Sequence, residues 1–352
     1  MSRFFSSKLD KLTAYTPGEQ PQDMQYIKLN TNESPYPPAQ NVQEAVAYEV
    51  EKLALYPDPE CSILREKIAK VYGVQPQNIL VSNGSDDILN FAFAAFGDQC
   101  KTAIFPDITY GFYTVFANLN GVNFKQIPLC EDFTINISDY YNANGPVFIA
   151  NPNAPTGIAL SVQQIENILK NNPDNVVVID EAYVDFGGKS CYPLIEKYDN
   201  LLVVQTYSKS RSMAGARLGF AIASEQIIDD LSTIKFSTNP YSINRMTMAA
   251  GIAVMDNNSY YMENCKKITD TREYVSSELT KLGFEVIPSK ANFIFAKSDR
   301  ISGGDLYQKL KQNGVLVRHF DNPRIRDYNR ITIGGAEQME QFIQIVKKIL
   351  EV

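Results

Sequence analysis

Four clusters of polar residues stand directly after short apolar runs, and their side chains could do chemistry together. One cluster contains an acid, Asp180, and another contains a primary amine, Lys209. The clusters are Asn83-Gly84-Ser85-Asp86 after ILVS, Asn151 to Gly157 after VFIA, Asp180-Glu181-Ala182-Tyr183 after VVVI, and Thr206 to Arg217 after LLVVQ. Singly, each has an ordinary explanation, because Asn-Pro and Thr-Gly are common in turns and a lysine in a polar loop is usually solvated.

Together, the side chains fit one cofactor. A lysine amine such as that of Lys209 can form a Schiff base with an aldehyde. An aspartate such as Asp180 suits a ring nitrogen that must stay protonated. Arg217 and a helix N-terminus at Ser85 suit a phosphate. An aldehyde, a pyridinium nitrogen and a phosphate together describe pyridoxal 5′-phosphate.

The apolar runs predict the sheet that would bring these clusters together. They are short, apolar on both faces and separated by amphipathic segments, which is typical of parallel strands covered by helices on both sides. The runs are ILVS (79–82), TAIF (102–105), VFIA (147–150), VVVID (176–180) and LLVV (201–204). Ligands bind at the carboxyl ends of the strands in such a doubly wound sheet. We therefore expect the polar clusters to meet at one edge, with Ser85 as the N-cap of a helix over DDILNFAFAAF.

After about residue 240 the pattern changes to that of a smaller α+β domain. A helical region near 242–282 is followed by FEVI, ANFIFAK, a helical DLYQKLKQNG, VLVRHF, RITIG and a final helix. The apolar stripe of that last helix (Met339, Phe342, Ile343, Val346, Ile349, Leu350) predicts packing on the small sheet rather than a partner surface. We expect a large cofactor-binding domain over 36–240, with an N-terminal arm (1–35) and 241–352 forming the second part.

Composition excludes several classes of protein. The 33 basic residues stand against 40 acidic ones, and the net charge of −7 argues against nucleic acid or an anionic membrane as the main partner. A single histidine, His319, leaves no multi-histidine metal site, and no metal is expected. The five scattered cysteines fit a reducing cytoplasm better than a disulfide framework. The start MSRFFSSKLDKL has charges where a signal peptide would need an apolar run, so a cytoplasmic protein is expected. The glycine patterns of dinucleotide, P-loop and α/β-hydrolase sites are missing.

Nearly the whole chain resembles the fold-type I pyridoxal-phosphate-dependent aminotransferases. The resemblance runs from IKLNTNESPYPP through LYPDPE, NGSDDIL, NPNAPTG, VVVIDEAYVDF and TYSKSRSMAGARLGFAIA to ANFIF. The ending VLVRHFDNPRI…RITIG points to the histidinol-phosphate branch of that family. The implied fold is a large doubly wound, mostly parallel-sheet domain plus a smaller α+β domain, and the implied assembly is a homodimer with shared active sites.

The resemblance also implies roles for individual residues. The catalytic ones are Lys209, which would form the Schiff base, Asp180, which would pair with the pyridine nitrogen, and Tyr183, which would donate to the ring's phenolic oxygen. Tyr110 would stack on the ring. The phosphate would be held by Ser85, Asp86, Ser208 and Arg217, and by Tyr56 of the neighbouring subunit.

One position departs from the family pattern. The second asparagine of the usual Asn-Asn-Pro-Thr-Gly, which donates to the phenolic oxygen, is Ala154 here. Asn153, a water molecule or Tyr183 alone would have to replace it, and we expect a modest change in cofactor tuning.

The expected reaction is transamination between a small amino donor and a 2-oxo acid. Arg330 would take the anionic end of the substrate, with Arg318 as a further candidate, because a guanidinium can bind phosphate and carboxylate bidentately. Tyr15, Asn32 and Tyr241 complete the predicted substrate contacts. Two alternative enzymes would share the cofactor residues: an aromatic or other amino-acid aminotransferase, and a threonine-phosphate decarboxylase-like enzyme. A regulatory module without turnover is disfavoured by the absence of an appended DNA-binding segment.

Overall fold

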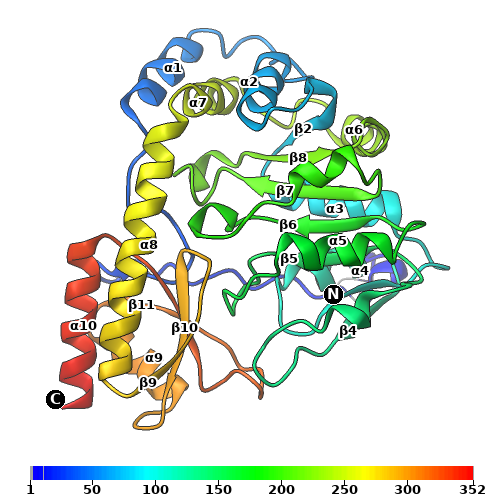
Figure 1. Ribbon diagram of the computed structural model, residues 1–352. Coiled ribbons are helices and arrows are strands. Elements are labelled where there is room, and N and C mark those ends of the chain that lie inside the picture. Colours follow the sequence, from blue (N-terminus) through cyan, green and yellow to red (C-terminus); the bar gives the residue numbers. More distant parts are fainter. Residues whose placement is uncertain (1–2, 11, 352) are drawn as a thin grey trace.

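The computed structural model describes residues 3–10 and 12–351, and its largest element is a seven-stranded sheet (Figure 1). The strand order is β2-β8-β7-β6-β5-β3-β4, and only β8 runs antiparallel to its neighbours. The bounds are β2 Ile79–Ser82, β3 Ala103–Pro106, β4 Phe124–Ile127, β5 Val147–Ala150, β6 Val177–Asp180, β7 Leu201–Thr206 and β8 Gly219–Ala223. The predicted doubly wound, mostly parallel sheet is confirmed.

Helices cover both faces of this sheet, which explains why its central strands are apolar except at the carboxyl ends of β6 and β7. On one face α3 (Ser85–Phe96), α4 (Phe112–Asn120) and α6 (Glu225–Thr238) share a buried core with strand residues such as Phe148 and Leu202. On the other face α2 (Ser62–Tyr72), α5 (Val162–Lys170) and α7 (Arg245–Asp256) pack against residues such as Ile149 and Val203. Every residue of β5, β6, β7 and β8 is buried, so the polar side chains among them, Asp180, Gln205 and Thr206, need hydrogen-bond partners within the protein.

The second part of the fold is a four-stranded antiparallel sheet of order β12-β13-β10-β9. Its strands are β9 Phe284–Ile287, β10 Phe293–Ser298, β12 Arg318–His319 and β13 Asn329–Thr332, and its helices are α8 (Asn258–Lys281), α9 (Gly303–Gln312) and α10 (Ala336–Leu350). The stripe of α10 is buried in this core, apart from Ile349, which is partly buried, as predicted. In Figure 1, α8 runs from the large sheet to the small one.

The N-terminal segment joins the small domain rather than lying free. Strand β1 (Ile27–Lys28) pairs in parallel with β11 (Val315–Leu316), so residues 29–33 are fixed beside the C-terminal part of the chain. Helix α1 (Gln40–Val50) then returns the chain to α7 and the large domain. The predicted domain boundary at residue 240 stays a prediction. Helix α7 lies after this boundary in the chain, but its residues Ala250 and Val254 are buried in the core of the large sheet.

Ser85 differs from its prediction by one position. Helix α3 begins at Ser85, and the N-cap is Gly84, with φ of 86°. An added Cβ at Gly84 would lie 2.7 Å from a terminal nitrogen of Arg217, so this position needs glycine both for its backbone and for the close approach of the guanidinium. The Ser85 side chain is thereby left facing the cavity described next. In residues 3–10 and 12–351, no helix combines the length and the apolarity that crossing a membrane requires.

Candidate active site

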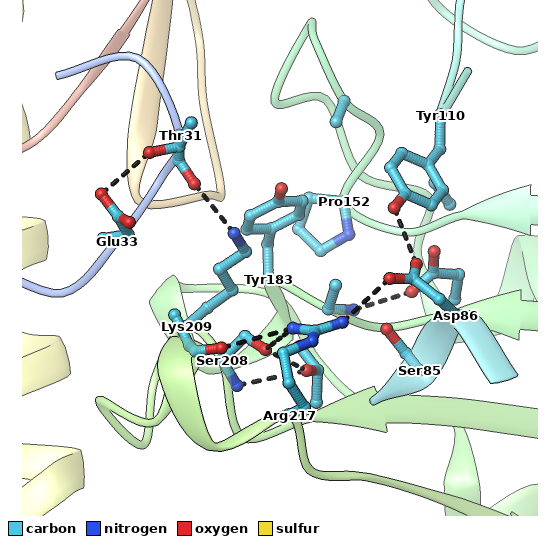
Figure 2. Close-up of a pocket in the computed structure, with 16 residues that line it drawn as sticks. Thr31, Glu33, Ser85, Asp86, Tyr110, Pro152, Tyr183, Ser208, Lys209 and Arg217 are labelled. Atoms are coloured by element: carbon cyan, nitrogen blue, oxygen red, sulfur yellow. Dashed lines mark hydrogen bonds and ion pairs between the residues drawn. The ribbon is translucent and has the colours of Figure 1, made fainter. Parts of the chain in front are cut away.

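The carboxyl ends of β5, β6 and β7 open into a cavity of about 240 Å³ in the large domain (Figure 2). Its lining contains eight residues predicted for the cofactor or for catalysis: Ser85, Asp86, Tyr110, Asp180, Tyr183, Ser208, Lys209 and Arg217. They come from the polar clusters after β2, β6 and β7 and from the start of α4. A sheet with these strand ends at one edge therefore brings the predicted side chains together.

Lys209 lines this cavity, and one hydrogen bond fixes the position of its amine. Its Nζ donates to the carbonyl oxygen of Thr31 at 2.9 Å. Burial, with a smaller contribution from the Arg330 guanidinium, lowers the pKa of Lys209 from 10.5 to about 8. A lysine amine with a lowered pKa is a better nucleophile and base near neutral pH.

Asp180 ends strand β6, and only 5% of its surface is exposed. Burial raises the pKa of this carboxyl from 3.8 to about 7, although the backbone N–H of Ala182 (3.2 Å) and the hydroxyl of Tyr113 (3.3 Å) donate to it. A buried carboxylate with no cation beside it is suited to receive one. The protonated nitrogen of a pyridine ring would supply that cation.

The opposite end of the cavity is suited to a phosphate. Arg217 has its backbone in the left-handed region (φ 54°), and it donates to Ser208 Oγ at 3.3 Å and to Asp86 Oδ2 at 3.0 Å. The other Asp86 oxygen accepts from the Tyr110 hydroxyl at 2.7 Å, so one carboxylate orients both residues. The N-terminus of α3 contributes free backbone N–H groups to this end.

These donors fit pyridoxal 5′-phosphate as a set. An amine for the aldehyde, a carboxyl for the ring nitrogen and a guanidinium with a helix N-terminus for the phosphate occur in one cavity, and Gly84 keeps the phosphate end open. Tyr183 lies over this space with its hydroxyl accepting from Asn32 Nδ2 at 3.0 Å. Burial raises the pKa of Tyr183, while Arg330 and the bond from Asn32 oppose the rise.

A second cavity of about 320 Å³ adjoins the first and shares Thr31, Tyr110, Tyr183 and Lys209 with it. The predicted substrate residues Tyr15, Asn32, Arg318 and Arg330 line it. Tyr15 reaches this place from the N-terminal arm by stacking on Phe112, with ring centroids 4.2 Å apart.

Arg318 and Arg330 are direct neighbours across β12 and β13 and lack any carboxylate partner within the described residues. Arg330 donates to the carbonyl oxygen of Asn30 at 2.9 Å, and its buried Nε has no acceptor. Burial lowers the pKa of Arg330, and Arg318 adds to this. Two like charges in register are unfavourable in a sheet unless an anion bridges them.

Three predicted site residues lie outside both cavities. Asn153 is 3% exposed, but its amide donates to the carbonyl of Ile108 (3.0 Å) and to Thr156 Oγ1 (3.2 Å). Ala154, by contrast, lines both cavities. Tyr56 is 77% exposed on the surface, where its ring stacks on that of Tyr241 with centroids 4.5 Å apart. These two tyrosines could meet a site only in another copy of the chain.

The sequence analysis missed Thr31, Glu33 and Tyr113. Tyr113 follows Tyr110 by one helical turn at the start of α4, a spacing that could have placed its hydroxyl near the same site. Thr31 and Glu33 stand in the quoted segment LNTNESP, from which only Asn32 was selected. The single histidine, His319, stacks on Tyr307 (centroids 5.7 Å apart) and lines neither cavity.

Comparison with known proteins agrees with this geometry. The profile of the aminotransferase class I and II family matches residues 24–346. The chain is 50% identical to a histidinol-phosphate aminotransferase of Brachyspira hyodysenteriae, over 100% of both chains. It is 48% identical to one of Acinetobacter baumannii strain AYE, over 98% of this chain and 97% of that one.

Among solved structures, the histidinol-phosphate aminotransferase of Sinorhizobium meliloti in complex with pyridoxal 5′-phosphate superposes with a TM-score of 0.88. The alignment covers 100% of this chain and 98% of that one, at 21% identity, which supports the fold. With the cavity and the full-length identity taken together, pyridoxal 5′-phosphate is the cofactor of this chain. The chain belongs to the class I and II aminotransferases and, within them, to the histidinol-phosphate aminotransferase family.

Proposed function

We propose that this chain transfers the amino group of L-histidinol phosphate to 2-oxoglutarate, giving imidazole acetol phosphate and L-glutamate, in histidine biosynthesis. The observation that carries the proposal is the pair of unneutralised guanidinium groups, Arg318 and Arg330, on register-paired residues beside Lys209. Such a pair suits a doubly charged phosphate better than it suits an apolar side chain. It also accepts the distal carboxylate of a 2-oxo acid.

We assign the roles of the residues as follows. When bound, the cofactor supplies the carbonyl carbon that receives the amino group and a ring that takes up the electron pair of the donor's α-carbon. Lys209 Nζ moves the proton from that α-carbon. Asp180 keeps the ring nitrogen protonated, and Tyr183 donates to the phenolic oxygen. Arg330 and Arg318 fix the phosphate of the donor.

Other residues orient or enclose the reacting groups. Asp86 fixes the positions of Arg217 and Tyr110, which hold the phosphate and the ring face. Tyr15, packed on Phe112, covers the mouth of the second cavity and limits the access of water.

A homodimer with shared sites is part of the proposal. Large apolar side chains are exposed on and near α1 and α2, where they offer a surface for a second copy of the chain: Tyr48, Leu53, Leu55, Tyr56 and Ile63, each at least 53% exposed. A hollow lined by Pro57, Ile63, Met248 and Ile252 adjoins them. Tyr56 on this surface would reach the cofactor phosphate of the partner. The five free thiols support a cytoplasmic location.

A donor screen tests this function. Cofactor-loaded protein is mixed separately with histidinol phosphate, phenylalanine and threonine phosphate, and the loss of the visible absorption band is followed. We expect histidinol phosphate to react fastest and to give a 2-oxo product. Preference for phenylalanine, or release of carbon dioxide from threonine phosphate, would contradict the proposal.

The role of Lys209 is tested independently of the substrate. Borohydride reduction of the loaded protein, followed by peptide mapping, should place the cofactor on Lys209. The variant Lys209→Ala should still bind the cofactor but turn over at background rate. A label on another lysine, or near-normal turnover of the variant, would refute the assignment.

A further inference from the structure

The segment Thr31–Glu33 forms a polar wall that faces the amine of Lys209 (Figure 2). The Thr31 carbonyl oxygen accepts from Lys209 Nζ at 2.9 Å, and the Thr31 hydroxyl donates to Glu33 Oε2 at 2.8 Å. Both residues line the cavity that contains Lys209. The amine thus has an acceptor directly in front of it and a carboxylate beside that acceptor.

This wall is fixed in place by the strands around it. Lys28 belongs to β1, where it is paired with Leu316, and its Nζ donates to Glu33 Oε1 at 2.7 Å. Asn32, between the two wall residues, is buried and accepts at Oδ1 from Thr332 Oγ1 at 3.0 Å. Glu33 is therefore held by partners on both carboxylate oxygens. Burial raises its pKa, but the bonds from Lys28 and Thr31 outweigh that effect and lower it, so Glu33 is ionised at neutral pH.

Of the carboxylates near Lys209, Glu33 is the one hydrogen-bonded to Thr31, whose carbonyl oxygen accepts from the lysine amine. Arg330 and Arg217 disfavour the cationic form of the lysine, whereas Glu33 and Asp86 favour it. Asp86, however, is bound directly to Arg217 and to the Tyr110 hydroxyl. The remaining neighbour is the ring of Tyr183, 6.0 Å from Nζ.

We propose that Thr31 and Glu33 form the docking place of the free Lys209 amine, with Glu33 as the positioning residue that stabilises this amine once it has taken up a proton. The proposal rests on the proposed function and deepens it. During transfer Lys209 must leave the cofactor carbon, wait within reach of it and accept a proton from the donor. The Thr31 carbonyl gives the released amine one position, and Glu33 compensates the charge it gains.

The protonation of Lys209 can be measured directly by trace acetylation. The full chain is loaded with pyridoxamine 5′-phosphate, the amine form of the cofactor, which leaves the lysine amine free with the ring in place. Brief treatment with acetic anhydride at a series of pH values, with the Lys209 peptide quantified by mass spectrometry, gives the midpoint at which the amine loses its proton. Because the midpoint is read rather than the rate, limited access of the reagent does not alter it.

We expect Glu33→Gln to lower this midpoint by about half a pH unit or more, as the loss of one screened charge in the same cavity requires. Lys28→Met should raise the midpoint, because it removes a cation and leaves Glu33 unneutralised. The acid limb of the pH profile of kcat should move in the same direction for each variant.

Glu285→Gln is the matched control. Glu285 also accepts from a lysine, Lys297, at 3.1 Å and from a hydroxyl, that of Tyr328, at 2.7 Å, but it does not line the Lys209 cavity. This variant should leave the midpoint of Lys209 unchanged. The proposal is overturned if Glu33→Gln behaves like Glu285→Gln, or if Lys28→Met and Glu33→Gln shift the midpoint in the same direction. Failure of the proposed function would appear differently, as borohydride labelling at a lysine other than Lys209.

Discussion

Arg330 is predicted to reduce the stability of the folded chain while providing substrate affinity, and Arg330→Met separates the two effects. In the protein without substrate its side chain is half-buried next to Arg318, its buried Nε has no acceptor, and it has no carboxylate partner among the described residues. Removing it relieves like-charge repulsion of about 0.2–1 kcal/mol and the cost of a partly desolvated cation that no anion neutralises. The variant loses one hydrogen bond to Asn30 and the contacts with the rings of Phe293 and Phe320, about 2 kcal/mol in total.

The net effect on folding should be a small gain, roughly 1 kcal/mol or about 2 °C in Tm for a chain of this size. The effect on catalysis should be large and opposite. Two charge-assisted hydrogen bonds to the substrate anion contribute about 3–4 kcal/mol, so kcat/KM for histidinol phosphate should fall by about 10²- to 10³-fold. Thermal unfolding of the cofactor-loaded protein and steady-state kinetics measure the two quantities.

Arg324→Met provides the control for this prediction. Arg324 lies in the loop between β12 and β13, but it is paired with Asp107 at 2.8 Å and donates to the carbonyl of Leu129. Its loss should lower Tm and leave kcat/KM nearly unchanged. Added inorganic phosphate should raise the Tm of the loaded wild-type protein but not that of Arg330→Met. An Arg330→Met protein less stable than Arg324→Met, or one that keeps kcat/KM within about threefold, would refute the reasoning.

Four further predictions concern the cofactor cavity and the exposed surface. Burial raises the pKa of Asp180 from 3.8 to about 7, so the folded protein binds a proton at this carboxyl that the unfolded chain has already lost. The unfolding free energy of cofactor-free protein should therefore fall by a few kcal/mol as pH rises from about 4 to 7. Chemical denaturation should show this slope, and Asp180→Asn should remove it. Tyr113→Phe should raise the pKa of Asp180 further and weaken cofactor binding about threefold to tenfold in equilibrium dialysis near pH 7, whereas unchanged affinity would show that the 3.3 Å bond is inert. Ala154→Asn should shift the pH midpoint of the visible absorption band modestly, and an identical titration would refute the expectation. Leu55→Lys should favour the monomer in analytical ultracentrifugation. A wild-type protein that is wholly monomeric in the same experiment would contradict the dimer.

The strands were the most predictable part of the fold. Two-sided burial keeps β5 apolar, and also β6 and β7 except at their carboxyl ends, and this requirement is visible in the sequence as continuous runs. Side chains that directly follow those runs, such as Asp180 and Lys209, were therefore also predictable as neighbours. Their meeting depends only on parallel strands ending at one edge.

Contacts that join distant parts of the chain were not predictable in the same way. Glu33 and Asn32 reach the cavity because β1 pairs with β11, and nothing in a two-residue strand indicates its partner. Asn153 was assigned to the cofactor from the family pattern, but its amide satisfies the backbone and hydroxyl groups around it instead. Ser85 was expected as a cap because serine favours that position, whereas the approach of Arg217 requires glycine there.

The pairing of β1 with β11 has a consequence for synthesis of the protein on the ribosome. Asn30 and Asn32 complete the substrate cavity only through Arg330 and Thr332, about 300 positions later in the chain. Strands β2 to β8 can assemble before those residues emerge, because domains generally fold as units during translation. We therefore expect a nascent chain halted before β13 to have the groups that we propose for the cofactor, Lys209 and Arg217, but to lack Arg330, the guanidinium that we propose for the amino donor.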